Sequence, residues 1–130
     1  MSKILFIDDD LLTLKLMKKA SEILGHQSFT CSDPVDAIQH VVHSDPDLIL
    51  IDINMQDVSG FQVVRQIRSH SLTAATPVLI VSAGDPYVEG KKALESGANG
   101  FISKPLSISG LDSAVKQYTR QEQLVCCPAF

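Results

Sequence analysis

The sequence predicts a single α/β domain built on a doubly wound, five-stranded parallel sheet. Short apolar runs alternate with stretches of helical periodicity, and the order strand-then-helix repeats five times along 130 residues. The central runs show no polar alternation, which is typical of parallel strands covered by helices on both faces. Right-handed crossovers and two more polar edges favour the strand order 2-1-3-4-5.

Each expected strand is a short run bounded by polar residues or glycine. The first, third and fourth runs are apolar throughout, whereas the second is half polar and the fifth is weaker, as expected of edge strands. In chain order, the strands are expected at residues 4–7, 27–31, 48–51, 78–81 and 100–102.

Capping residues indicate where several of the intervening helices begin and end. Asp33 and Asp85 each precede a proline, a pair that favours the first turn of a helix, and Ser59 offers a further N-cap. Gly25 and Gly97 stand where helices are expected to end in a left-handed residue. In the first and last helical segments, apolar residues recur at helical spacing and predict faces that pack against the sheet.

Composition and charge exclude several classes of protein. Hydrophobic residues make up 45% of the chain and charged residues 20%, which excludes intrinsic disorder. The net charge of -4 argues against direct binding of nucleic acid. No apolar run reaches the ~18 residues of a membrane span, and the N-terminus is unlike a signal peptide. We therefore expect a cytoplasmic protein whose cysteines are reduced.

The helical periodicity lapses after about Arg120. We expect one domain over residues 1–120, because a chain of this length matches one domain of ordinary size. Residues 121–130 are expected to form a flexible tail or the start of a linker.

Charged and polar residues follow the expected strands, and in such sheets ligands bind beyond the carboxyl ends of the strands. These residues are Asp8, Asp9 and Asp10 after the first strand, Asp52 after the third, Ser82 after the fourth, and Ser103, Lys104 and Pro105 after the fifth. We expect carboxylates, a hydroxyl and an ammonium group to meet at one edge of the sheet.

The carboxylates at this edge predict a magnesium site. Each close pair of carboxylates repels by about 4 kcal/mol at an effective dielectric constant near 20. Asp8, Asp9 and Asp52 with Lys104 sum to a charge of about -2, which one divalent cation cancels, and oxygen ligands with retained waters favour Mg²⁺. The alternative is that the three aspartates cap the first helix. Capping leaves the residues after the other strands unexplained.

An aspartate beside Mg²⁺ that faces a cation and a hydroxyl is suited to attack a phosphoryl group. The metal and Lys104 would stabilise charge on the transferred oxygens, and in-line attack would give an aspartyl phosphate.

The chain resembles the receiver domain of two-component response regulators, and most of all the single-domain members of the chemotaxis-regulator type. The resemblance covers roughly residues 3–120 and implies a flavodoxin-like fold. The matching pieces are residues 4–10, Asp52-Ile53-Asn54-Met55 with Gly60, Val81-Ser82-Ala83, and Phe101-Ile102-Ser103-Lys104-Pro105. Each piece is weak alone, but together and in this order they are specific.

The resemblance implies a role for each of these residues. Asp52 accepts a phosphoryl group from the phosphohistidine of a histidine kinase or histidine phosphotransfer protein. Asp9, Asp52 and the main-chain carbonyl of Asn54 bind Mg²⁺, and Asp8 acts chiefly through water. Ser82 and Lys104 contact the phosphoryl group, Phe101 turns inward behind Ser82, and the Lys104-Pro105 bond is cis.

The resemblance also implies that the domain is a signalling switch rather than an enzyme. It would catalyse only its own phosphorylation and dephosphorylation, and would change the surface formed by helix 4, strand 5 and helix 5 for an output partner. Neither nucleic acid nor a membrane is expected as a direct partner.

Two positions depart from the family pattern. Gln56 follows Met55 where the family usually has proline, and we expect a looser loop after Asp52 with no ligand lost. Phe101 lacks the phenolic hydroxyl that many relatives carry there, so it is either a switch residue or a plain core residue.

Two other classes share parts of this pattern. A phosphatase of the haloacid-dehalogenase type also attacks with an aspartate beside Mg²⁺, and Asp8 and Asp10 have its Asp-x-Asp spacing, but the chain lacks a cap insert. A nucleotide- or flavin-binding module needs a phosphate-binding loop after the first strand, where three aspartates would repel phosphate. Turnover of a small phosphorylated substrate would favour the phosphatase.

Overall fold

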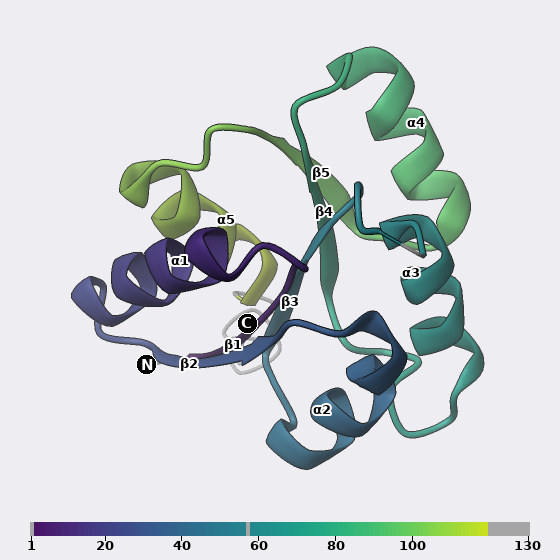
Figure 1. Cartoon of the computed structure of the whole chain (residues 1–130), viewed down its shortest axis with the longest axis horizontal. Helices are drawn as coiled ribbons and strands as arrows, with labels where there is room; N and C mark the ends of the chain where they lie inside the picture. The colour runs from purple at the N-terminus through teal and green to yellow at the C-terminus, as the bar shows by residue number, and fades with distance from the viewer. Residues whose placement is uncertain (1, 57, 120–130) are drawn as a thin grey trace, which may run out of the picture.

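The computed structural model describes residues 2–56 and 58–119 and contains one five-stranded parallel sheet (Figure 1). The sheet has the order β2-β1-β3-β4-β5, so the predicted fold class and strand order are confirmed. Its strands are β1 (Lys3–Ile7), β2 (Gln27–Cys31), β3 (Leu48–Asp52), β4 (Val78–Ser82) and β5 (Gly100–Ser103). The predicted tail, residues 121–130, lies outside the described residues.

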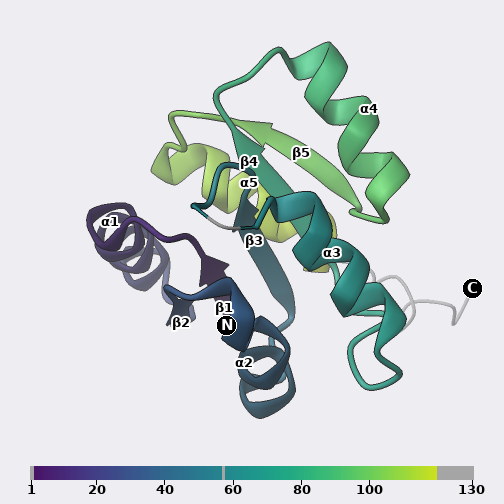
Figure 2. The ribbon, with the colours of Figure 1, turned by 45° about the vertical axis from the view of Figure 1, so that its right-hand side comes forward.

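In the part of the chain that the structure describes, five α-helices cover the two faces of the sheet (Figures 1 and 2). They are α1 (Leu11–Ile23), α2 (Ala37–Ser44), α3 (Gly60–Ser69), α4 (Pro86–Ser96) and α5 (Ile108–Thr119). Helices α1 and α5 lie on one face, and α2, α3 and α4 lie on the other. Within the described ranges, no helix is both long enough and apolar enough to cross a membrane.

The core lies on both faces of the sheet, because successive residues of a strand point to opposite sides. On the α2–α4 face, Leu5 and Ile49 join a buried cluster with residues of those helices. On the α1–α5 face, Phe6 and Leu50 join a second buried cluster. Strands β3 and β4 are buried along their whole length, which agrees with the apolar run that precedes the polar residue at the end of each.

The capping residues lie at helix ends, with one difference. Ser59 forms a reciprocal capping box with Gln62 at the start of α3, and Asp85 accepts a hydrogen bond from the main chain of Tyr87 at the start of α4. Asp33 instead caps a short 3-10 turn, η1 (Pro34–Asp36), that precedes α2. The predicted cap at Asp33 with proline in the first turn is therefore confirmed, and the helix that it begins is a 3-10 turn rather than the first turn of α2.

At the amino-terminal ends of β4 and β5, Arg68 ties the end of α3 to its neighbours. Its Nε donates to the carbonyl of Gly97 at 2.8 Å, and its Nη2 donates to Oδ1 of Asn99 at 2.8 Å. Nη1 donates to the carbonyls of Ala74 and Thr76. This guanidinium group therefore joins α3, the end of α4 and the entry to two strands at the edge opposite the predicted site.

Candidate functional site

The carboxyl ends of the strands bring the predicted residues to one edge of the sheet. Asp8 directly follows β1, Asp52 ends β3, and Ser82 ends β4. Strand β3 pairs with β1 on one side and with β4 on the other, and the register places Asp52 opposite Val81. Asp52 therefore lies near the middle of the edge, flanked by β1 and β4.

Three carboxylates form an acidic cluster at this edge. One oxygen from each of Asp8, Asp9 and Asp52 lies within 4.8 Å of the other two. Asp8 and Asp52 are buried, Asp9 is exposed, and Oδ2 of Asp8 has no hydrogen-bond partner among the described residues. A buried carboxylate oxygen without a partner, beside two further carboxylates, fits an oxygen-binding divalent cation.

Burial raises the pKa of Asp8 to about 6. The main-chain amide of Asp10, which donates to Asp8 at 3.0 Å, lowers this pKa, and the charge of Asp52 raises it further. The raised pKa therefore arises chiefly from burial, with a smaller contribution from the neighbouring carboxylates. A cation bound here would favour the ionised form of Asp8.

Asp10 has a different role from its two neighbours. Its side chain caps α1, accepting hydrogen bonds from the main chain of Leu12 at 3.2 Å and from the hydroxyl of Thr13 at 2.7 Å. The capping interpretation is therefore correct for Asp10 alone. Asp8 and Asp9 remain for the acidic cluster.

Lys104 supplies the positive charge beside Asp52. Its Nζ lies 2.7 Å from Oδ1 of Asp52, an ion pair in which one partner is almost fully buried. Among the described residues, Oδ1 has no partner with hydrogen-bond geometry, so the contact is mainly electrostatic. The Lys104-Pro105 peptide bond is cis, as the resemblance implies, and the main chain of Lys104 donates to the carbonyl of Ser82.

Ser82 and Phe101 lie on the same face of the sheet. Phe101 pairs with Ile80 across β4 and β5, and Ser82 is two residues further along β4. The hydroxyl of Ser82 accepts a hydrogen bond from the main chain of Gly84 at 3.0 Å. The ring of Phe101 is half-buried against the core cluster on the α2–α4 face, which is compatible with either of its two predicted roles.

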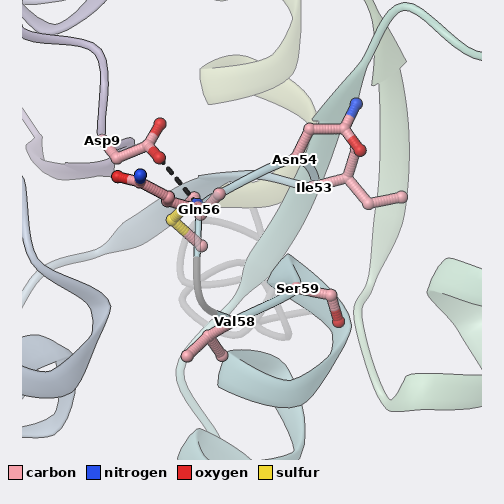
Figure 3. Close-up of a pocket in the computed structure, with 7 residues that line it drawn as sticks. Asp9, Ile53, Asn54, Gln56, Val58 and Ser59 are labelled. Carbon is pink, nitrogen blue, oxygen red and sulfur yellow. Dashed lines mark hydrogen bonds between the residues drawn. The ribbon is translucent and has the colours of Figure 1, made fainter.

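The loop between β3 and α3 lies beside the acidic cluster and lines an open pocket of about 550 Å³ (Figure 3). In this loop, the main-chain amide of Gln56 donates to Oδ2 of Asp9 at 2.7 Å. The amide of Gly60 donates to the carbonyl of Ile53 at 3.0 Å. The described part of this loop is therefore tied to Asp9 by one hydrogen bond, and the expectation that Gln56 loosens the loop stays a prediction.

Gly60 lets α3 begin against the strand that carries Asp52. A Cβ atom at this position would lie 2.6 Å from the main-chain oxygen of Asp52 and 3.0 Å from Cα of Ile53. Real Cβ atoms do not approach backbone this closely. Glycine is thus required by the packing of α3 on the end of β3.

Comparison with known proteins shows the family to which the chain belongs. Residues 4–116 match the family described as "Response regulator receiver domain". The transcriptional regulatory protein PhoP of Bacillus subtilis is 30% identical, over 94% of this chain and 50% of PhoP. The sensor histidine kinase RcsC of Salmonella typhi is 31% identical, over 91% of this chain and 12% of RcsC. The chain thus spans half or less of these two relatives.

Relatives of similar length and solved structures agree with this match. The response regulator DivK of Brucella ovis is 26% identical, over 88% of this chain and 94% of DivK. A receiver domain protein from Clostridium thermocellum superposes with a TM-score of 0.84 at 26% identity, over 96% of this chain and 99% of that one. The Vibrio cholerae protein CheY4 shares the fold, with a TM-score of 0.84 at 24% identity over 91% of this chain and 98% of that one. With the family match covering most of the chain, the protein belongs to the response regulator receiver domains and is a phosphoacceptor signalling domain.

Proposed function

We propose that Asp52 is the phosphoacceptor and that its donor is the phosphohistidine of a histidine kinase or a histidine phosphotransfer protein. The position of Asp52 carries this proposal. It is buried in the middle of the strand edge, 2.7 Å from the Lys104 ammonium and next to two further carboxylates. In the transfer, an Oδ of Asp52 forms a bond to phosphorus as the bond from phosphorus to the imidazole nitrogen breaks. The electron pair stays with the imidazole.

The residues of the acidic cluster would hold Mg²⁺. Asp9, Asp52 and the main-chain carbonyl of Asn54 are the proposed ligands, and Asp8 acts through water. When bound, Mg²⁺ supplies positive charge that screens the aspartates from the phosphoryl oxygens. Lys104 supplies the second positive charge, because it lies beside Asp52 in the described structure.

Ser82 and Phe101 are proposed to carry the signal to the surface formed by α4, β5 and α5. The hydroxyl of Ser82 bonds to Gly84, so turning it toward a phosphoryl oxygen would release that loop amide. Phe101 lies on the same face of the sheet, one strand away, and could fill the space that Ser82 leaves. The output partner would then bind the changed surface.

We further propose a cytoplasmic protein that acts on no separate substrate. The domain would catalyse only its own phosphorylation and dephosphorylation, without direct contact to nucleic acid or a membrane. The capping role of Asp10 supports this over a phosphatase of the haloacid-dehalogenase type, which needs the second aspartate of Asp-x-Asp as a general acid. Asp10 is instead held by Leu12 and Thr13 at the start of α1.

Exposure to acetyl phosphate with Mg²⁺, followed by intact-mass measurement, tests the assigned acceptor. The wild type should gain the mass of one phosphoryl group, and Asp52→Asn should gain none. Asp10→Asn is the matched control, since asparagine caps a helix as well as aspartate and leaves the acceptor in place. If Asp52→Asn gains a phosphoryl group as the wild type does, the assignment is wrong.

A further inference from the structure

The hydrogen bond between Gln56 and Asp9 joins two loops that the proposed cation site needs. The donor is the main-chain N–H of Gln56, 47 positions along the chain from its acceptor, Oδ2 of Asp9 (Figure 3). At 2.7 Å it has the length of a charge-assisted bond to a carboxylate. It therefore connects the segment after β1 with the segment after β3.

The residue type at position 56 makes this bond available. A proline there would have no N–H to donate, whereas glutamine keeps the donor. Within residues 2–56 and 58–119, the Asp9 carboxylate accepts no other hydrogen bond, and its side chain is exposed. Among the described residues, the Gln56 amide is therefore the one hydrogen-bond donor that orients this carboxylate.

We propose that the main-chain amide of Gln56 is a positioning group for the divalent cation. It fixes the Asp9 carboxylate relative to the loop that carries Asn54, and it leaves the remaining acceptor capacity of the carboxylate free. Loss of the hydrogen-bond partner of a metal-binding carboxylate typically lowers metal affinity by about 10–100-fold. This inference rests on the magnesium site proposed above.

A substitution that removes only the donor tests this role. Gln56→Pro deletes the N–H, and Gln56→Ala keeps it while removing the exposed side chain. Titration with Mg²⁺, followed by amide NMR shifts, should give a dissociation constant about tenfold higher for Gln56→Pro than for Gln56→Ala. Equal or tighter binding by Gln56→Pro would overturn the proposal.

A double-mutant cycle separates positioning of Asp9 from a general effect on the loop. In an Asp9→Ala background, Gln56→Pro should cause no further loss of Mg²⁺ affinity, because the carboxylate that it positions is absent. A loss of the same size in both backgrounds would show that Gln56→Pro acts only by disturbing the loop, and would overturn the proposal.

Measurements on the unmodified residue 56 keep the proposal testable if Gln56→Pro does not fold. In metal-free protein, Asp9→Ala should speed hydrogen exchange of the Gln56 amide. In the wild type, saturation with Mg²⁺ should slow that exchange, whereas faster exchange would show that the cation displaces the bond and would overturn the proposal. If the wild type binds no Mg²⁺ at all, the proposed magnesium site itself fails. If the wild type binds but the variants do not differ, only the role of Gln56 fails.

Discussion

At the residue scale, the charge of the Asp8 carboxyl depends on pH. Burial raises its pKa to about 6, so the folded state holds its proton more tightly than the unfolded chain, where the pKa is 3.8. When the pKa of an acid is higher in the folded state than in the unfolded chain, the free energy of unfolding falls as pH rises from the lower pKa to the higher one. In metal-free protein, the contribution of Asp8 to the free energy of unfolding should therefore be lost between about pH 4 and pH 6.

Comparison of the wild type with Asp8→Asn isolates this effect from other titrating groups. Urea unfolding with a chelator, at about pH 4.5 and about pH 7, should show the wild type losing stability relative to Asp8→Asn as pH rises. A relative gain over the same interval would contradict the assigned shift. Affinity for Mg²⁺ should change in the opposite direction, rising with pH, since a cation favours the ionised carboxylate.

Residues also show how far the sequence determines the site. The meeting of Asp8, Asp9 and Asp52 could be predicted because the carboxyl ends of neighbouring parallel strands share one edge. The bond from Gln56 to Asp9 could not, because its donor is a main-chain group that every residue except proline carries. The absence of proline at position 56 is the available signal, because it leaves an N–H group in the loop after Asp52.

At the scale of elements, the start of α3 limits what can stand beside Asp52. Gly60→Ala would place a Cβ 2.6 Å from the main-chain oxygen of Asp52, so either α3 or the end of β3 must move. Gly90→Ala, inside α4, meets nothing within 4 Å. The first substitution should destabilise the protein, and the second should stabilise it by about 0.5–1 kcal/mol through helix propensity.

Thermal or urea unfolding of the two glycine variants measures this contrast, and acceptance of phosphate from acetyl phosphate reports on the site. We expect Gly60→Ala to slow phosphorylation of Asp52 and Gly90→Ala to leave it unchanged. Similar stability of both variants would show that α3 can shift without cost at its first residue.

Element boundaries differ in how well the sequence specifies them. The strands could be placed within one residue at each end, because a buried parallel strand is an apolar run that stops at a polar residue. The 3-10 turn before α2 could not, because Asp33 and Pro34 favour the first turn of any helix and do not determine its pitch.

At the scale of the whole molecule, we expect a fold that does not depend on a metal ion. Two buried apolar clusters, one on each face of the sheet, hold the strands and helices together. Addition of a chelator at room temperature should leave the circular dichroism spectrum of the folded protein unchanged. Mg²⁺ should add only the mass-action contribution, about 2.7 kcal/mol at a hundredfold excess over the dissociation constant. Unfolding by the chelator would contradict this.

The guanidinium group of Arg68 holds the carboxyl-terminal end of α4 against α3. It holds the carbonyl of Gly97, which follows the last turn of α4, whereas the first turn of α4 carries Tyr87 with 84% of its surface exposed. A helix that is held at one end is displaced most at its other end. We therefore expect the carboxyl-terminal end of α4 to move less than its first turn when the loop after Ser82 moves. A small displacement of the loop after Ser82 would move Tyr87 the most. The amino-terminal ends of β4 and β5 would stay in place.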